Sequence, residues 1–141
     1  MSELAPADRS ALQELNARFA WALDDHEFDA LREILMPEAH YVSVGREFQD
    51  LETIIASFKA RTESRTTRHG MGNLLLSADG PGRATGRSSW FTFASNAAAP
   101  TDPEVYMVAD FRDVYVLTPA GWRIAERIIT PVFRRADLAP N

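Results

Sequence analysis

Hydrophobic residues recur at helical spacing over the first third of the chain. A helix is predicted from about Pro6 to Asp24, and its apolar face repeats at three- and four-residue steps through Leu12, Leu15, Phe19, Ala22 and Leu23. A second, shorter helix is predicted over residues 28–35, with Phe28, Leu31 and Leu35 at the same spacing. Pro37 ends it, because a proline pushes the preceding residue out of the helical region.

A short strand pair and a third helix follow. His40–Val44 is predicted to be a strand, and Gly45 supplies the turn into a brief return over Glu47–Gln49. Asp50 is a good N-cap for the third helix, which we expect to run to about Thr62. Its buried stripe is predicted to be Leu51, Ile54, Ile55 and Phe58.

Beyond the third helix the hydrophobic period falls to two and stays there. Four strands are predicted, over Thr67–Ser77, Arg83–Ser95, Val105–Leu117 and Trp122–Phe133, with turn residues between them. Short connections between long strands imply an antiparallel meander. The order is ααββαββββ, an α+β arrangement in which helices cover a strongly curved sheet, and its concave interior suits a small-molecule pocket.

Composition narrows the classes of function. The 141 residues are 45% hydrophobic and 25% charged, with no cysteine, which fits one domain spanning residues 1–141. A net charge of −5 without a basic run argues against nucleic acid or an anionic membrane as a partner. No leader or long apolar segment is recognisable, so we expect a cytoplasmic protein. The chain has no phosphate-binding glycine motif, and its three histidines lack metal-ligand spacing, so neither a cofactor nor a metal is expected.

One histidine stands in a pocket-like pattern. On a strand, Thr67, His69, Met71 and Asn73 would share one face, which mixes polar groups with an apolar side chain. His69 could be a base in such a pocket, or equally a half-buried side chain bonded to its surroundings. Asp24 ends the first helix away from the apolar stripe, which favours a solvated helix end; beside a histidine, it would instead orient the ring.

Other side chains could bind a substrate. Arg127 on the last strand could stabilise negative charge, or it could pair with Glu126, Asp110 or Asp113 on the outer surface. Tyr41 and Asn73 could donate hydrogen bonds to a carbonyl, although ordinary strand packing would also account for them. Four further aromatic residues are more typical of a hydrophobic core than of a ligand cage: Trp21, Trp90, Phe91 and Phe93.

Short segments across the chain resemble the SnoaL-like branch of the nuclear transport factor 2-like superfamily. They are Ala22-Leu23-Asp24, Phe28-Asp29-Ala30-Leu31, Thr67-Arg68-His69 with Asn73, and Gly121-Trp122-Arg123-Ile124-Ala125. The resemblance runs from about Asp8 to Phe133 and implies a cone-shaped α+β barrel. The pattern is most similar to the group of scytalone dehydratase, bile-acid 7α-dehydratase and hexachlorocyclohexane dehydrochlorinase.

The resemblance implies roles for three residues. Enzymes of that group use a cavity histidine as base, an aspartate from the end of the first helix to orient it, and often an arginine from the last strand. Carried over, these are His69, Asp24 and Arg127. Where such enzymes tend to have a tyrosine or lysine on the first helix, this chain has Phe19, so that end of the pocket, with Trp21, is more apolar.

These observations favour a cofactor-free lyase or isomerase of dehydratase type. Its expected substrate is a small hydrophobic cyclic molecule that contacts Phe19, Trp21 and Met71 besides the polar residues above. Two alternatives stay open at this point: a non-catalytic ligand-binding or subunit protein of the same fold, and a polyketide or terpenoid cyclase. Because both faces of Val105–Leu117 are hydrophobic, a homodimer through the outer face of the sheet is expected, with a trimer as the alternative.

Overall fold

The computed structural model describes residues 3–100 and 102–141, so the predicted domain of residues 1–141 is covered except for positions 1, 2 and 101. A long helix, α1 (Pro6–Asp24), and a short 3-10 helix, η1 (Phe28–Glu33), come first. The strands β1 (Leu35–Ser43) and β2 (Arg46–Phe48) precede helix α2 (Leu51–Lys59). Four long strands and a closing 3-10 turn complete the chain: β3 (Thr66–Ala78), β4 (Arg83–Ser95), β5 (Val105–Thr118), β6 (Gly121–Arg134) and η2 (Ala136–Leu138).

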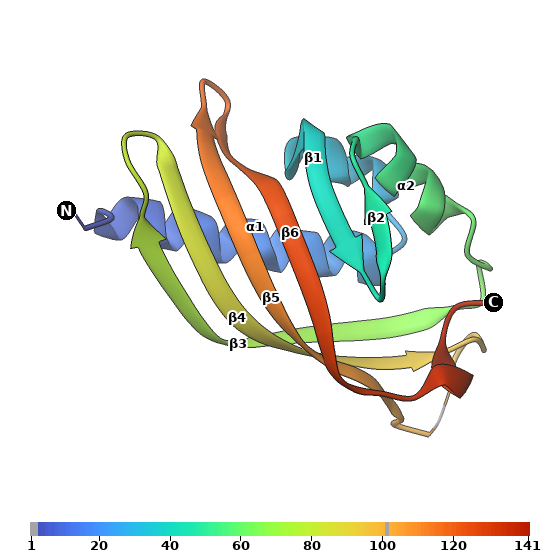
Figure 1. The fold of residues 1–141 in the computed structure, drawn as a ribbon. Helices are drawn as coiled ribbons and strands as arrows, with labels where there is room; N and C mark the ends of the chain where they lie inside the picture. Colours follow the sequence, from blue (N-terminus) through green and yellow to red (C-terminus); the bar gives the residue numbers. More distant parts are fainter. Residues whose placement is uncertain (1–2, 101) are drawn as a thin grey trace.

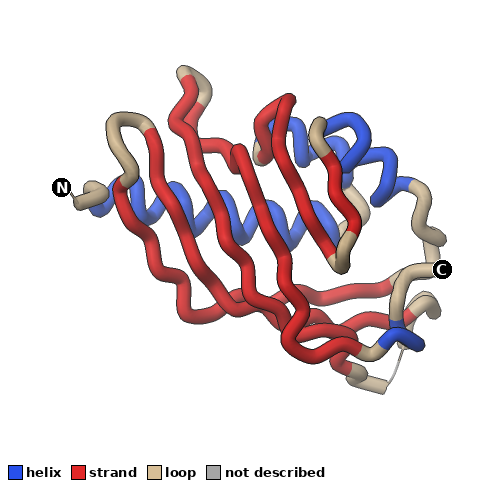
Figure 2. Tube along the Cα trace, in the orientation of Figure 1, coloured by secondary structure: helices blue, strands red, loops and turns tan. Residues whose placement is uncertain are grey.

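The strands form one sheet in the order β2-β1-β6-β5-β4-β3. The predicted antiparallel meander of β3 to β6 is confirmed. An additional pairing, the parallel one between β1 and β6, extends this meander at its last strand. The four long strands bend midway along their length, and α1 runs across them on one face (Figure 1). Figure 2 shows the same curved strand layer with the helices gathered on that side.

The predicted second helix differs from the structure. Its residues form only a 3-10 turn that ends at Glu33, and β1 begins at Leu35 and continues through Pro37. The strand can contain a proline because its pairing with β6 is interrupted between Leu35 and His40, so the missing N–H removes no bond from the ladder. The third helix also ends earlier than predicted, at Lys59, whereas its Asp50 cap is confirmed by a 2.8 Å bond from Thr53 N.

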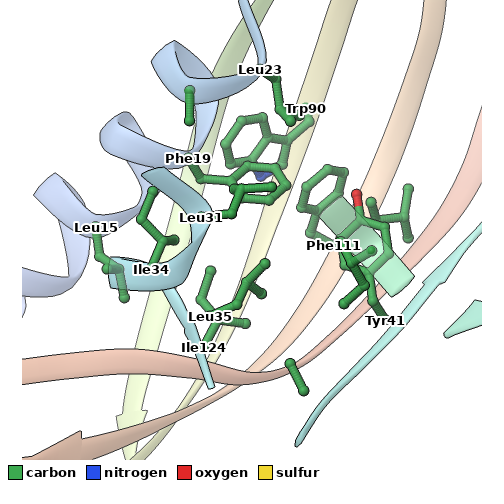
Figure 3. Close-up of a cluster of buried hydrophobic side chains, with 14 of the residues drawn as sticks. Leu15, Phe19, Leu23, Leu31, Ile34, Leu35, Tyr41, Trp90, Phe111 and Ile124 are labelled. Carbon is green, nitrogen blue, oxygen red and sulfur yellow. The ribbon is translucent and has the colours of Figure 1, made fainter. Parts of the chain in front are cut away.

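The core lies between α1 and the concave face of the sheet. Figure 3 shows Phe19 of α1 among buried side chains that include Trp90, Phe111 and Tyr41. The Trp90 and Phe111 rings stack with centroids 4.6 Å apart, and Phe19 meets Trp90 edge-on at 6.1 Å. Burying each such ring contributes roughly 1.5–3 kcal/mol to folding, so this aromatic group is a main source of stability for the concave face.

Three aromatic residues that the sequence assigned to the core lie on the surface instead. Trp21 is 56% exposed, and Phe91 and Phe93 also point outward, because strand alternation turns them away from the side that buries Trp90. Phe93 pairs with Val105 on the neighbouring strand, which makes the outer face apolar there. The homodimer expected through this face stays a prediction. Among the described residues, no helix is long and apolar enough to cross a membrane.

Candidate functional site

His69 and Asp24 meet at the point where α1 ends against β3. The Nδ1 atom of His69 lies 2.6 Å from Oδ1 of Asp24, and the backbone N–H of His69 donates to Oδ2 at 3.0 Å. The hydroxyl of Thr67 donates to Oδ1 at 2.8 Å. The Asp24 side chain is only 3% exposed, so it is not the solvated helix end that its position on the helix favoured. The contact between Asp24 and His69 that the family resemblance implies is present, and the catalytic roles of the two residues stay a prediction.

The carboxylate of Asp24 stays ionised in this setting. Burial by itself would raise the pKa of Asp24, but the hydrogen bond and the charge of His69, with the bond from Thr67, lower it overall. An ionised carboxylate can only accept hydrogen bonds, so Nδ1 of His69 carries a proton in the pair. In the neutral form of the ring, the other nitrogen, Nε2, is then the free acceptor. This is the state that a general base requires.

His69 lines a cavity of about 490 Å³ that opens between the bent sheet, the end of α1 and α2. Two other predicted residues line it as well, Phe19 and Tyr41. A cavity of this size is in the range that holds a small organic ligand. The larger apolar side chains on the rest of the wall come from several elements: Leu23, Val44, Phe48, Phe58, Tyr106, Met107, Phe111 and Ile129.

Tyr41 offers a hydroxyl on the cavity wall. Among the described residues, none forms a hydrogen bond with this hydroxyl, although the side chain is almost wholly buried. Burial raises the pKa of Tyr41 to about 12, partly offset by the charge of Arg127, so the group is a hydrogen-bond donor at neutral pH. The sequence named this residue as a donor, and its position leaves it free to serve as one.

Arg127 does not line the cavity, and it does not lie on the outer surface either. It is 0% exposed, and its Nε and Nη2 atoms donate to Oδ1 and Oδ2 of Asp113 at 2.8 and 2.9 Å. Nη2 also donates to Asn16, and the guanidinium lies 4.5 Å from the centroid of the Phe19 ring. Tyr115 donates to the same carboxylate at 2.7 Å. The charge is thus neutralised inside the core, and the role predicted for Arg127 in binding substrate is not supported by its position.

A bulge in β6 explains why strand alternation misplaced Arg127. Tyr115 pairs with Ile124 and Val114 pairs with Glu126, which leaves Ala125 as an extra residue. In a regular strand only residues an even number of positions apart share a face. The extra residue at Ala125 shifts this alternation by one position, so Arg127 lies in the core with Ile124, three residues before it.

The other predicted binding residues lie away from the cavity. Asn73 is exposed in a second bulge, between Gly72 and Leu75, and has a left-handed φ of 55°. The bulge ends the face that Asn73 would have shared with His69. Trp21 is exposed and packs against Arg68, with 5.7 Å from the guanidinium to the ring centroid. Met71 is half-buried against the core and pairs with Trp90 across the sheet, outside the residues that line the cavity.

Sequence reasoning missed three residues of the site. Thr67 anchors Asp24, and Arg61 and Arg65 line the cavity between α2 and β3. Arg61 falls at the end of the predicted third helix, outside its apolar stripe, and Arg65 falls in the segment between that helix and the next strand, so no pattern pointed to either arginine. Among the described residues there is no group of three side chains suited to hold a metal ion.

Comparison with known proteins places the chain in a family. A model of the SnoaL-like domain matches residues 5–128. An uncharacterized protein of Mycobacterium tuberculosis is 27% identical over 139 residues, covering 92% of this chain and 88% of that protein.

Solved structures agree on the fold. A Kribbella flavida protein has a TM-score of 0.81 at 21% identity and covers 92% of this chain and 94% of its own. An NTF2-like protein with a cystatin-like fold from Novosphingobium aromaticivorans has a TM-score of 0.76 at 24% identity, covering 94% and 86%. A protein of the same organism, provisionally named a scytalone dehydratase, has a TM-score of 0.76 at 11% identity, covering 92% and 87%. The chain therefore belongs to the SnoaL-like family and has the NTF2-like fold.

Proposed function

We propose that the protein is a lyase or isomerase of dehydratase type in which His69 removes a proton from a carbon next to a carbonyl group. The observation that carries this proposal is the 2.6 Å contact between Nδ1 of His69 and Asp24 on the wall of a cavity of about 490 Å³. The contact leaves Nε2 as the nitrogen available to a ligand. A base on the wall of a cavity that can hold a small organic ligand is well placed to meet a carbon acid bound there.

The reaction proceeds in two proton transfers. Nε2 takes the proton, and the electron pair of the broken C–H bond forms an enolate with the carbonyl. In a dehydration, the enolate expels a β-hydroxyl group, which takes the proton from the imidazolium and leaves as water. In an isomerisation, the imidazolium returns the proton to a different carbon. Asp24 stabilises the imidazolium between the two transfers, since it is ionised and 2.6 Å away.

Tyr41 is the proposed donor to the enolate oxygen. Its hydroxyl lines the same cavity and is protonated at neutral pH. A donor that is already in position before charge develops stabilises the transition state without a reorganisation cost. This role replaces the one that the sequence assigned to Arg127, whose charge is engaged by Asp113.

Screening tests the proposal directly. Cyclic β-hydroxy ketones are incubated with the protein, and formation of the conjugated enone is followed by absorbance. Exchange of α-protons in heavy water is followed by NMR for substrates that cannot dehydrate. We expect His69→Gln to lower the rate by about 10²–10⁴-fold, the usual contribution of a positioned base. His40→Gln is the matched control, because His40 pairs with Glu126 and Glu47 outside the cavity.

The result also separates the two other functions that the fold allows. A non-catalytic ligand-binding protein would show no turnover that depends on His69, so equal rates for the wild type and His69→Gln would refute the proposed function. A cyclase would use the same base and differ only in its product, which mass spectrometry of the reaction mixture identifies.

A further inference from the structure

Apart from the histidine His69, every acidic or basic side chain that the structure places on the cavity wall is an arginine. Four arginines line the cavity, and no aspartate or glutamate does so among the described residues. The four are Arg46, Arg61, Arg65 and Arg134. A cavity lined by one sign of charge concentrates the opposite charge from solution, because its low-dielectric walls focus the field. The wall therefore favours an anionic ligand although the chain as a whole carries a net charge of −5.

Arg65 is the most deeply buried of the four, at 3% exposure. Its Nη1 atom donates to Oδ1 of Asn96 at 2.9 Å and to the carbonyl of Leu138 at 2.8 Å. Its Nε and Nη2 atoms are buried and have no partner among the described residues. Burial lowers the pKa of Arg65 to about 10, and the charge of Arg61 adds to this, so the guanidinium is still charged at neutral pH. A buried charge without an opposite partner is unfavourable and calls for a reason.

Arg61 has no counter-charge either. No side-chain hydrogen bond or ion pair joins it to another described residue, and its guanidinium lies over the Phe58 ring, 4.6 Å from the centroid. Burial lowers the pKa of Arg61, and the charge of Arg46 acts in the same direction. The other ionisable groups that act on the two arginines are the hydroxyls of Tyr41 and Tyr106. Two guanidinium groups thus share one end of the cavity, and neither forms an ion pair with a described residue.

The chain itself shows what the unpaired edge of Arg65 can bind. Arg127 uses the same two atoms, Nε and Nη2, to hold both oxygens of Asp113 at 2.8 and 2.9 Å. This is the side-on fork in which a guanidinium binds a carboxylate through two parallel hydrogen bonds. In Arg65 the same two atoms have no partner among the described residues but are covered by neighbouring side chains, so an anion reaches them only if the guanidinium or its cover shifts, whereas Nη1 is occupied by neutral acceptors.

We propose that Arg61 and Arg65 form an anion subsite that binds a carboxylate, or an oxyanion of the same chemistry, at the end of the substrate remote from its reacting carbon. The inference rests on the proposed function, because it assigns the substrate class of the same cavity. Arg65 lies directly before β3 and precedes His69 by four residues, a backbone span of about 13 Å at the usual rise of an extended chain. The substrate is therefore a cyclic acid whose apolar body lies between the two groups, which adds an anionic group to the small hydrophobic cyclic molecule predicted from the sequence.

An isosteric pair of probes tests the subsite without knowledge of the substrate. Naphthoate and naphthamide have the same aromatic body and differ in the charge of one group, and their dissociation constants are measured by calorimetry at neutral pH. We expect naphthoate to bind at least about 10-fold more tightly, since hydrogen bonds to charged groups are the stronger ones. Naphthalenesulfonate, measured in parallel, shows whether the site prefers a carboxylate to other oxyanions.

Variants assign the preference to the subsite. Arg61→Gln should reduce the preference for naphthoate to about 3-fold or less while leaving naphthamide binding unchanged, because Arg61 makes no structural hydrogen bond. Arg18→Gln, which removes an exposed arginine of α1, should leave both constants as they are. In labelled protein, the Nε–H resonance of Arg65, assigned with Arg65→Lys, should shift with naphthoate and not with naphthamide.

Three results would overturn the proposal: equal binding of the two probes, no saturable binding of naphthoate at millimolar concentration, or an equal loss of both probes in Arg61→Gln. The same titration in His69→Gln keeps this inference separate from the proposed function. A preference for naphthoate that persists in His69→Gln supports the subsite. This binding result does not depend on whether His69→Gln also loses activity.

Discussion

Replacing Asp24 by asparagine exchanges one carboxylate oxygen for an NH₂ group in a side chain that accepts three hydrogen bonds. The carboxylate accepts from Nδ1 of His69, from the backbone N–H of His69 and from Thr67, at 2.6, 3.0 and 2.8 Å. The amide has only one acceptor oxygen. If that oxygen keeps the Nδ1 and Thr67 bonds, the NH₂ group faces the backbone N–H of His69, donor against donor. If the amide flips, the NH₂ group faces Nδ1 and favours the ring tautomer with its proton on Nε2.

Both arrangements weaken the site by a similar amount. An unsatisfied buried donor costs about 1–3 kcal/mol, and exchange of a charged acceptor for a neutral one costs about 1 kcal/mol more. We therefore expect Asp24→Asn to lower the free energy of unfolding by about 2–4 kcal/mol. For a domain of this size that loss corresponds to a decrease in Tm of about 4–16 °C.

Two assays check this prediction. Urea denaturation gives the free energy of unfolding for the wild type, Asp24→Asn and the neighbouring Asp25→Asn, whose exposed carboxylate makes no side-chain hydrogen bond to a described residue. Nitrogen NMR of the imidazole reports the tautomer, which should carry its proton on Nδ1 in the wild type. A loss in Asp24→Asn no larger than that in Asp25→Asn would show that the hydrogen bonds of Asp24 do not stabilise the fold. A wild-type ring protonated on Nε2 alone would show that Asp24 does not hold the proton on Nδ1.

Three further predictions concern the same network and its surroundings. The pKa of Asp24 is below its ordinary value of 3.8, so the contribution of Asp24 to stability is complete above pH 3.8 and is lost as the pH falls through the lowered pKa. The stability difference between the wild type and Asp24→Asn, measured by urea denaturation across this range, should therefore shrink in acid. A difference that stays constant with pH would contradict this prediction. Asp113→Asn should lower the free energy of unfolding by about 3–5 kcal/mol, because it leaves the buried charge of Arg127 without a counter-charge. The double variant Asp113→Leu with Arg127→Met should recover most of that loss in the same assay. A double variant no more stable than Asp113→Asn would show that the unpaired charge is not the cause. Tyr41→Phe should lower turnover of an accepted substrate by about 10²-fold with Tm nearly unchanged, since its hydroxyl has no partner among the described residues, and unchanged turnover would exclude Tyr41 as the oxyanion donor.

Periodicity predicted the elements because it reflects burial directly. The α1 helix and the four long strands follow from this periodicity. The Asp50 cap follows from the residue type at the start of the third helix, and it too depends only on residues close in sequence. The burial of Asp24 does not follow from it. That burial depends on contacts with β3 at sequence separations of 43 and 45 residues, which only the resemblance to the family pointed to.

Arg127 and the cavity arginines show two other limits. One extra residue at Ala125 reverses the inward side of β6, and the sequence carries no glycine or proline there to indicate a bulge. Arg61 and Arg65 lie outside any predicted apolar stripe, where exposed arginines are the ordinary expectation. The burial of Arg65 depends on the ring of Tyr106 and on the chain near Leu138, which come from distant parts of the sequence.

The central claim is that His69 acts as a base toward a carbon acid inside the cavity, and one rate measurement tests it without knowledge of the substrate. Nitrobenzisoxazole loses a carbon-bound proton to a base and opens to a coloured phenolate in a single step, so absorbance follows proton removal itself. We expect the wild type to accelerate this reaction above buffer, His69→Ala to return it to the buffer rate, and His40→Ala to retain the wild-type rate. A His69→Ala protein as fast as the wild type would show that His69 is not the base.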